Sequence, residues 1–371
     1  MVVPAVREAT LAELEDWDRW TVDRPGGNVL QSLAWGQYQL TRGLRPRFLI
    51  DAAGGRTLAL ERPWAIAHGG TAYLPRGPVT DPGSDLAAAA DRLRAVSDWL
   101  AERGADAVTS DAEIPADSGY GLLLRQRGFR PAEEEQPSRH RLSLPLGPGA
   151  SEAGCLANMS MSTRQRVRGA QRHGLEVLRY EASPRALDEP GLTTLDVAEL
   201  PVERLAAVLE GFYPIVLGTA LRRHFRMAPL ARFVDWSTRA LVARLALLLE
   251  VRAADGELLG GALLYRHGRR LTYATAADRA EARRSNPGAI HLLLWRAIQI
   301  ALAEGLDELD LAGVDVAGAR HRPAEGDPMY GLLAFKESFG GQWIELVGNQ
   351  QRMVRPMHYA VGRTGNRLAN V

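Results

Sequence analysis

The sequence predicts an α+β fold made of two similar halves. Its 371 residues are enough for two domains of ordinary size. Sheet strands are mixed with long helices in each half and do not alternate strictly with them, which disfavours a doubly wound fold. The two halves also echo each other, because long helices ending in AERGAD (101–106) and AEGLD (303–307) are each followed by a short strand that carries an acid, Asp111 and Asp310. We therefore expect a duplicated unit, with the site in a cleft between the halves.

The spacing of apolar residues predicts the elements of the first half. A helix over Asp85–Arg103 ends at Gly104, and a second helix over Asp117–Arg127 ends at Gly128. The predicted strands are Arg47–Ile50, Thr57–Glu61, Thr71–Leu74, Asp106–Ser110 and Arg139–Leu146. A Gly-Pro-Gly linker at 147–149 closes this half.

The second half follows the same rules. A helix is predicted from Ser151 to His173, before Gly174, and a region of helices from Val202 to Arg244. The remaining helices are predicted at Gly288–Glu304 and Leu332–Ser338. The predicted strands are Leu175–Tyr180, three between Leu245 and Ala276, Glu308–Ala312 and Trp343–Val347.

Charge and cysteine content exclude several classes of protein. Forty-five basic and 44 acidic side chains give a net charge of +1, so a nucleic-acid partner must meet a local patch. Cys155, the single cysteine, cannot form an internal disulfide, and no Cys/His group has zinc spacing, so we expect no metal and a cytoplasmic location. Charged residues interrupt the apolar runs, which predicts neither a signal peptide nor a membrane span.

Common cofactor and nucleophile motifs are absent from the sequence. There is no Walker motif, no G-x-G-x-x-G and no G-x-S-x-G. The pyrophosphate loop of acyl-CoA transferases, [RQ]-x-x-G-x-[GA], fails at its last position in all four places where it begins: Arg24, Arg125, Arg166 and Gln171. We therefore expect no cofactor, and Cys155 is expected to be a packed residue.

One residue type is nearly missing. The basic residues are 44 arginines and a single lysine, Lys336. GC-rich coding replaces lysine by arginine wherever a generic positive charge is sufficient. A lysine that resists this drift is a candidate for a place where one compact ammonium must approach one oxygen, although its chance survival on the surface is the alternative. Phe335 beside it could stack on a nucleoside, or Phe335 and Phe339 could belong to the core.

Two arginine clusters are further candidates. Arg164, Arg168 and Arg172 recur every four residues and so share one helix face, where they could follow a row of phosphates. Arg222, Arg223 and Arg226, which follow Tyr213, form the second cluster. Charge runs usually face water, so a solvated surface is the alternative for both clusters.

Five segments together resemble the Fem family, the aminoacyl-tRNA-dependent transferases that build peptidoglycan cross-bridges. They occur in family order over nearly the whole chain: Val29–Trp35 (VLQSLAW), Tyr73–Val79 (YLPRGPV), Ser162–Gly174 (STRQRVRGAQRHG), Leu309–Gly313 (LDLAG) and Phe335–Gly340 (FKESFG). The resemblance implies two acetyltransferase-like (GNAT-type) domains with mixed sheets and a groove between them. It implies that the C-terminal tail completes the first domain, so we expect domains at 1–148 plus 347–371 and at 149–346. Residues 181–245 are too few for the coiled-coil arm of some relatives, which indicates an armless form resembling FemX.

The resemblance also implies partners and residue roles. Aminoacyl-tRNA is the expected donor, with Phe335 near its terminal nucleoside and Lys336 near the ester carbonyl. The expected acceptor is an amine of a peptidoglycan-precursor stem peptide, either lipid-linked or nucleotide-linked, and a peripheral membrane surface is a further candidate partner. Candidate residues for the precursor are Arg76, Arg222, Arg223 and Tyr273. Gln37 stands where some members have a lysine, which leaves the form of the precursor open.

Asp111 is the one acid expected to orient the incoming amine, with a turn cap as its alternative role. Two other functions remain open. One is an acyl-CoA-dependent N-acyltransferase on the same scaffold, and the other is a Fem-like transferase that acts on a small metabolite or a protein. A non-catalytic RNA-binding protein is a third possibility, for which Lys336 would be dispensable.

Overall fold

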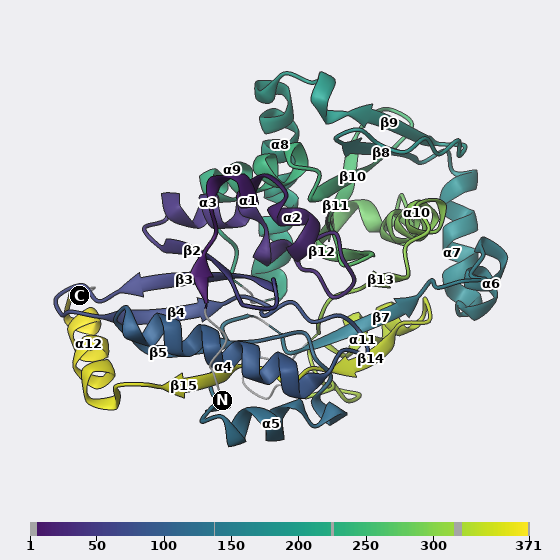
Figure 1. The fold of residues 1–371 in the computed structure, drawn as a ribbon. Coiled ribbons are helices and arrows are strands. Elements are labelled where there is room, and N and C mark those ends of the chain that lie inside the picture. Colours follow the sequence, from purple (N-terminus) through teal and green to yellow (C-terminus); the bar gives the residue numbers. More distant parts are fainter. Residues whose placement is uncertain (1–5, 137, 224–225, 315–320, 370–371) are drawn as a thin grey trace. The chain divides into compact units, whose positions relative to one another are not determined.

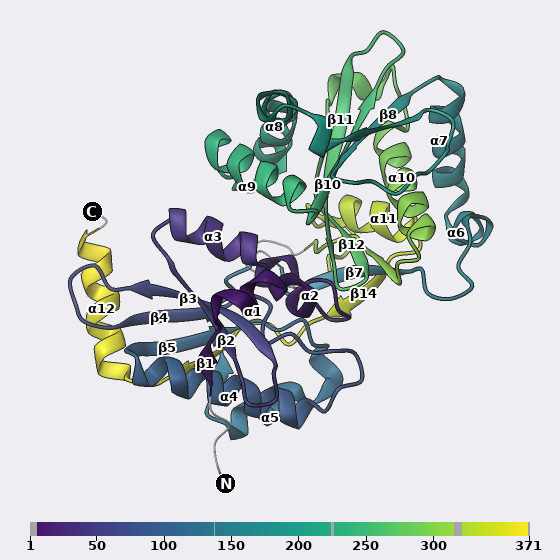
Figure 2. The same ribbon diagram turned by 45° about the horizontal axis from the view of Figure 1, so that its top comes forward.

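The computed structural model describes residues 6–136, 138–223, 226–314 and 321–369. The chain divides into two compact units: unit 1 comprises residues 1–140 and 344–371, and unit 2 comprises residues 141–343. Figures 1 and 2 show the elements of each unit in two views. The division falls near 140 and 343, where the sequence led us to expect 148 and 346, because the strand after His140 pairs with the sheet of unit 2.

Unit 1 is built on a seven-stranded sheet with the strand order β1-β2-β3-β4-β5-β15-β6. Pairing is antiparallel except between β4 and β5, which are parallel. The strands are β1 (Arg7–Glu8), β2 (Arg45–Ile50), β3 (Arg56–Pro63), β4 (Gly70–Leu74), β5 (Ala105–Ser110), β6 (Arg130–Pro131) and β15 (Gln350–Met353). The helices are α1 (Leu11–Glu15), α2 (Trp17–Thr21), α3 (Leu33–Thr41), α4 (Leu86–Glu102), α5 (Tyr120–Gln126) and α12 (Pro356–Ala369).

Unit 2 is built on an eight-stranded sheet with the order β14-β7-β13-β12-β11-β10-β8-β9. The pairs β12/β13 and β8/β9 are parallel. The strands are β7 (His140–Pro145), β8 (Glu176–Glu181), β9 (Leu192–Asp196), β10 (Ala246–Arg252), β11 (Leu258–His267), β12 (Arg270–Asp278), β13 (Glu308–Asp310) and β14 (Gln342–Glu345). The helices are α6 (Glu152–Asn158), α7 (Met161–Arg172), α8 (Val202–Arg223), α9 (Leu230–Val242), α10 (Ala289–Ala303) and α11 (Tyr330–Glu337).

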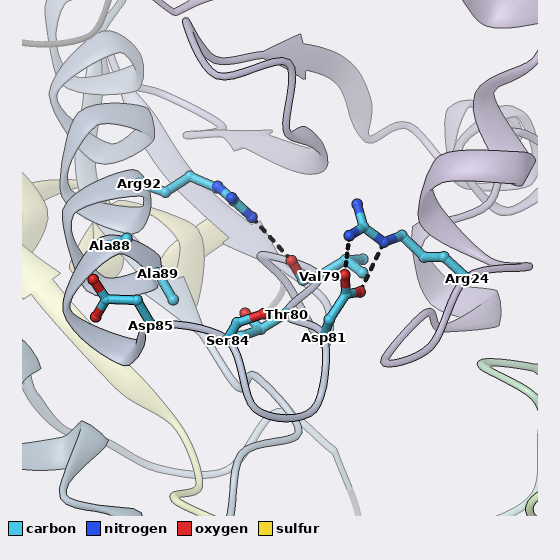
Figure 3. Close-up of a pocket in the computed structure, with 9 residues that line it drawn as sticks. All are labelled: Arg24, Val79, Thr80, Asp81, Ser84, Asp85, Ala88, Ala89 and Arg92. Carbon is cyan, nitrogen blue, oxygen red and sulfur yellow. Dashed lines mark hydrogen bonds and ion pairs between the residues drawn. The ribbon is translucent and has the colours of Figure 1, made fainter.

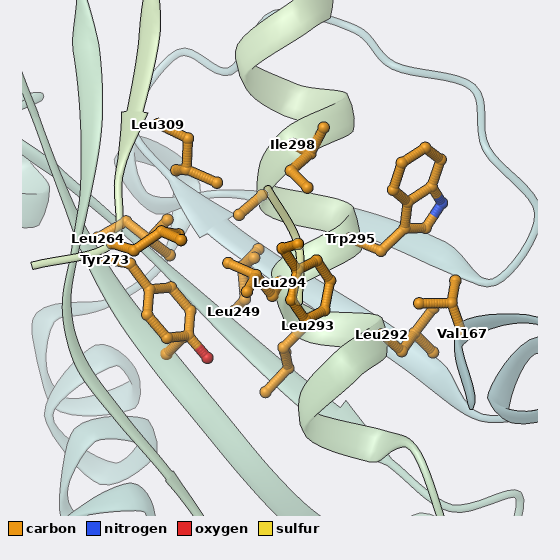
Figure 4. Packing of buried hydrophobic residues seen from close by; sticks show 14 of the residues in the cluster. Val167, Leu249, Leu264, Tyr273, Leu292, Leu293, Leu294, Trp295, Ile298 and Leu309 are labelled. Atoms are coloured by element: carbon orange, nitrogen blue, oxygen red, sulfur yellow. The ribbon is translucent and has the colours of Figure 1, made fainter. Parts of the chain in front are cut away.

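Helices cover both faces of the unit 2 sheet. In Figure 2, α8 and α9 lie on one face and α7 and α10 on the other. On the α10 side, Leu249 and Leu264 of the sheet meet Leu293 and Ile298 in one apolar cluster (Figure 4). On the α8 side Phe212 packs so closely on Gly261 that a Cβ there would lie 2.9 Å from its ring. A sheet covered on both faces explains why its central strands are nearly continuous apolar runs.

Helix α8 is long and apolar enough to cross a membrane by length and composition, with a mean hydropathy of 1.3. No other helix in the described part of the chain meets this test. Its buried residues Leu205, Leu209, Phe212 and Val216 recur at helical spacing and pack on β11, β12 and α9. Such a pattern is typical of a helix that covers a sheet, so the test is weak evidence for a span.

Two sequence expectations need correction in the helices. The helix expected over 151–173 is two helices, because Ser160 is an N-cap whose Oγ accepts the Thr163 N–H at 3.2 Å, which starts α7 anew. Helices α1 to α3 and α12 and strands β1, β6, β9 and β15 were not expected. Most of them are short or lie in unit 1: β1, β6 and β9 are edge strands, β15 lies between β5 and β6, and α12 contacts β4 and β5.

Candidate functional site

Lys336 lies on α11, and its side chain is buried in unit 2. The Nζ atom donates hydrogen bonds to the carbonyl oxygens of Ala312 and Gly313, at 3.2 and 3.1 Å. An ammonium has three donors, so one remains after these two bonds. Burial lowers the pKa of Lys336 to about 7; the negative charge of Asp310 opposes this shift, and the positive charge of Arg223 adds to it. The amine therefore changes charge near neutral pH.

The loop that holds Lys336 follows strand β13. Asp310 ends the strand, and its Oδ1 accepts the N–H of Ala312 at 2.8 Å. Its Oδ2 accepts the hydroxyl of Thr272 at 3.4 Å, and the Thr272 hydroxyl lies 3.0 Å from His267 Nε2. Ala312 has φ +59°, in the left-handed region that alanine rarely adopts, so these bonds stabilise an unfavourable backbone conformation.

Phe335 and Phe339 form an aromatic group with His291 of α10. Phe335 is half-buried and meets the His291 ring edge-to-face with centroids 5.1 Å apart, while Phe339 is fully buried in the core. Burial, and secondarily the charge of Arg166, lowers the pKa of His291 to about 4, so the ring is neutral at pH 7. The alternative interpretation of the two aromatics as core residues holds for Phe339, whereas Phe335 is partly buried and packs against the edge of the same core.

Helix α7, which carries the arginine stripe, is tied by two hydrogen bonds to Ser338, the C-cap of α11. Thr163 Oγ1 donates to Ser338 Oγ at 2.7 Å, Ser160 N–H donates to Ser338 O at 2.8 Å, and Ser338 Oγ in turn donates to Phe335 O at 2.7 Å. The structure thus brings the basic helix and Lys336 together within unit 2, which their separation of more than 160 residues in sequence gave no means to predict.

The three arginines of the stripe differ in role. Arg164 donates to the carbonyl oxygens of Leu156 and Ala157, at 2.9 and 3.1 Å, and so caps the C-terminus of α6. Arg168 and Arg172 are exposed and border an open depression of about 530 Å³ together with Gln165 and Gln171. Only these two members of the stripe present a guanidinium to a ligand.

The candidates for precursor binding in unit 2 also differ. Arg222 and Arg223 are exposed in the last turn of α8, and Arg222 donates to Thr219 Oγ1 at 2.9 Å and to Asp278 O at 3.3 Å. Arg223 is close enough to Lys336 to influence its pKa. Tyr273 is placed differently: its ring lies in the apolar core (Figure 4), and its hydroxyl is buried without a hydrogen-bond partner among the described residues.

Asp111 follows β5 in unit 1 and is fully buried. Its Oδ1 accepts the backbone N–H of Arg76 at 2.6 Å, and its Oδ2 accepts the hydroxyl of Tyr73 at 2.9 Å. Burial raises the pKa of Asp111 to about 6, although the Arg76 charge favours the ionised form. Gln136 Nε2 donates to the Tyr73 hydroxyl at 2.9 Å. Sequence reasoning missed Tyr73 and Gln136 as members of this group.

The bonds of Asp111 combine the two roles considered for it. Arg76 has φ +53°, and Asp111 holds its backbone N–H as a turn-capping acid does. The guanidinium of Arg76 is itself nearly buried and donates to Ser138 O at 3.1 Å. Asp111 is only 1% exposed, so it would act on a substrate through the Arg76 and Tyr73 that it holds.

The first two segments that resemble the Fem family contact each other in the structure. Gln31 is buried, and its Nε2 donates to Pro75 O at 2.7 Å, while its Oε1 accepts the Leu58 N–H at 2.7 Å. The segments Val29–Trp35 and Tyr73–Val79 are thus joined through a glutamine side chain. Gln37 is exposed on α3.

A small cavity of about 100 Å³ lies beside the start of α4 in unit 1 (Figure 3). Arg24 Nε donates to Asp81 Oδ1 at 2.8 Å. Arg92 donates to Val79 O at 3.0 Å and pairs with Asp51 at 2.8 Å. Because both guanidinium groups are already paired, this cavity offers no free charge to a ligand.

Cys155 is buried in the apolar cluster of unit 2, as expected for a packed residue. Burial raises the pKa of its thiol, which makes it a poor nucleophile. Among the described residues, no group of three or more His, Cys, Asp or Glu is arranged to hold a metal ion.

Comparison with known proteins supports the family resemblance. Residues 237–366, which include Lys336 and Asp310, match the model of the FemAB family. The crystal structure of FemX matches with a TM-score of 0.74 and 18% identity, over 96% of this chain and 100% of that chain. No curated protein gives a significant sequence match.

Two more distant structures have a similar fold. L-PGS from Bacillus licheniformis is 12% identical with a TM-score of 0.54, over 97% of this chain and 98% of that chain. A conserved protein of unknown function from Bacteroides thetaiotaomicron is 12% identical with a TM-score of 0.55, over 94% of this chain and 98% of that chain. The structural matches confirm the predicted α+β fold, and the FemAB match together with the FemX fold supports the predicted resemblance to the Fem family.

Proposed function

We propose, on the basis of the FemAB match and the FemX fold, that this chain moves an amino acid from aminoacyl-tRNA to an amine of a peptidoglycan-precursor stem peptide. The observation that carries the proposal is the single lysine of the chain, which is buried, follows a partly buried phenylalanine and binds two carbonyl oxygens. Because aminoacyl-tRNA is made in the cytoplasm, we expect the reaction to take place there.

The reaction is the aminolysis of an ester. The acceptor amine attacks the ester carbonyl, a C–N bond forms, and the C–O bond to the tRNA ribose breaks. The proton lost by the amine ends on the ribose oxygen, so no oxidant or cofactor is consumed. An ester is already activated toward an amine, and the protein therefore supplies mainly position and charge.

Lys336 supplies the charge. Two of its three donors are fixed by Ala312 and Gly313, and the third, which bonds to none of the described residues, would donate to the oxyanion that forms on the ester carbonyl. Arginine would retain the charge in a wider planar group that does not fit the same two carbonyl oxygens. Phe335, which is only partly buried, would stack on the terminal nucleoside of the tRNA.

The other residues serve binding. Arg168 and Arg172 would contact phosphates of the tRNA, and Arg222 and Arg223 the pyrophosphate of the precursor. In unit 1, Asp111 would hold Arg76 and Tyr73 in place for the acceptor. Tyr273, which is enclosed in the core, has no direct part in this scheme.

The proposal can be tested by supplying donors and acceptors separately. The enzyme is incubated in EDTA with a mixed aminoacyl-tRNA pool and a panel of nucleotide-linked precursor, lipid-linked precursor and small amines, and products are identified by mass. We expect one acceptor to gain the mass of an amino-acid residue. Transfer from acetyl-CoA instead would favour the N-acyltransferase alternative. Transfer only to a small amine would support aminoacyl-tRNA as the donor but would show that the acceptor is a small metabolite and not the peptidoglycan precursor.

A further inference from the structure

Helix α12 is held against unit 1 by one of its faces. Gly362 lies so close to Trp64 that a Cβ there would come within 2.2 Å of the indole, and Tyr359 meets the same ring edge-to-face at 5.7 Å. The N–H of Ala65 donates to Asn366 Oδ1 at 2.8 Å. Figure 1 shows this helix in yellow beside β4 and β5, which it contacts. Its orientation is therefore fixed.

The opposite face carries apolar side chains that nothing in the described structure covers. Met357 is 82% exposed and Val361 65% exposed, and four residues separate them, so they share one face of the helix. Ile66, in the loop that α12 packs on, is 70% exposed and lies next to Gly365. Helix and loop together present three large apolar side chains to solvent.

The charges of these two segments have one sign. Residues 62–70 and 354–371 contain no Asp or Glu. Their basic residues are Arg62, Arg355, Arg363, Arg367, His68 and His358. Asp106, a buried carboxylate outside these segments, pairs with Arg355 at 2.8 Å and also lies 4.0 Å from His358 Nδ1, so it offsets charge at these two residues. The whole chain has a net charge of only +1, and these two segments contribute four arginines and no acid to it, so the concentration of positive charge is local.

We propose that α12 and the loop 64–69, together called the α12 surface, dock on an anionic lipid bilayer. A helix fixed on one face, with apolar side chains on the other and arginines alongside, is typical of a segment that lies in the membrane interface. Met357, Val361 and Ile66 enter between the headgroups, and the exposed Arg62 and Arg363 meet lipid phosphates. A second copy of this chain is disfavoured as the occupant, because a symmetric contact would place the same positive charges against each other.

The test uses the full chain and lipid vesicles. Sedimentation is measured with vesicles of phosphatidylcholine alone and with vesicles containing about one third phosphatidylglycerol. The variant Met357→Glu/Val361→Glu places two carboxylates on the exposed face. Leu122→Glu is the matched control, because Leu122 is 63% exposed on α5 of the same unit.

We expect wild type and Leu122→Glu to bind the anionic vesicles alike, binding to weaken with salt, and the double variant to bind at least about 10-fold more weakly. Binding to neutral vesicles should be small for all three. The proposal is overturned if wild type does not bind anionic vesicles, or if the double variant binds as well as the control. If ultracentrifugation shows that wild type is a dimer and the double variant a monomer, the α12 surface would instead be an interface with a second copy of the chain.

Discussion

Asp310 and Lys336 bind the same short segment of backbone. Asp310 accepts the N–H of Ala312 at 2.8 Å, while Lys336 donates to the carbonyl oxygens of Ala312 and Gly313. The carboxylate thus fixes the loop on which the ammonium rests, and its charge also favours protonation of the amine. Asp310 is a positioning residue in the proposed reaction.

Substitution Asp310→Asn should change the pH profile. The negative charge of Asp310 raises the pKa of Lys336, so its removal should lower that pKa below its present value of about 7. Activity that needs the ammonium is present below this pKa and is lost as pH rises through it. We expect the alkaline limb of the kcat–pH profile to move to lower pH by about one unit. At pH values above the pKa of Lys336, kcat should therefore be about 10-fold lower than in wild type.

Asp307→Asn is the matched control for this prediction. Asp307 also precedes β13 but forms an exposed ion pair with Arg269 at 2.7 Å. Its substitution should leave the limb in place. If both variants retain the wild-type limb, Asp310 has no influence on the amine.

Lys336 should also affect stability through pH. Its pKa is lowered on folding, so the unfolded chain binds more protons between pH 7 and the ordinary lysine pKa, and stability from this group rises as pH rises through that range. From pH 7 to pH 9, wild type should gain about 2 kcal/mol in free energy of unfolding relative to Lys336→Met. Urea unfolding at both pH values measures the difference. Parallel pH dependence of the two proteins would show that the amine is not buried as described.

Arg168 and Arg172 of α7 should affect tRNA binding but not stability. Arg168→Glu/Arg172→Glu should raise KM for aminoacyl-tRNA and flatten its dependence on salt by about one unit of log–log slope per lost phosphate contact, without a change in Tm. Arg185→Glu, at an exposed arginine outside α7, is the control and should have little effect. An unchanged salt slope would identify the stripe as a solvated surface.

Arg164→Ala should behave differently from its neighbours. Because Arg164 caps α6 through Leu156 O and Ala157 O, its loss should destabilise unit 2 by about 1 kcal/mol and lower Tm by a few degrees. The KM for aminoacyl-tRNA should remain near the wild-type value. A large rise in KM at constant Tm would return Arg164 to the binding surface.

Asp111→Asn should weaken the acceptor side of the reaction. An amide oxygen cannot accept both the Arg76 N–H and the Tyr73 hydroxyl in the same geometry, so both residues lose a fixed position. We expect KM for the acceptor to rise about 10-fold, and Tyr73→Phe to produce a smaller rise. The wild-type change in activity near pH 6, where Asp111 ionises, should disappear in the variant. Wild-type kinetics and pH profile in Asp111→Asn would leave the acid no part in the reaction.

Much of the fold could be predicted from local patterns. Strands β2, β5 and β10 and helices α4 and α10 were predicted because each is long or strongly apolar and ends at a glycine or a change of period. Helix α12 and strand β15 could not be predicted in this way. Strand β15 pairs with β5 across about 240 residues, and α12 shows an apolar face to solvent, so neither has a local signal of its place in the fold.

The candidate site was predictable only in part. The rarity of lysine in this chain singled out Lys336, but no pattern indicated that Ala312 and Gly313 would hold its amine. Tyr273 illustrates the opposite case. A polar aromatic residue on a strand was expected to face a ligand, whereas the alternation of β12 directs it into the core. Residue type suggests a role, and only tertiary structure decides whether the side chain is accessible.

The most direct test of the account is single-turnover transfer from aminoacyl-tRNA to the identified acceptor by wild type and Lys336→Arg, at saturating concentrations of both substrates. Arg239→Lys, which exchanges the same two residue types in an exposed ion pair on α9, is the control. We expect Lys336→Arg to remain folded and to lose about 10²-fold or more in rate, as for the loss of one oxyanion donor, while the control is unaffected. A wild-type rate in Lys336→Arg would contradict the central claim that this lysine carries the chemistry.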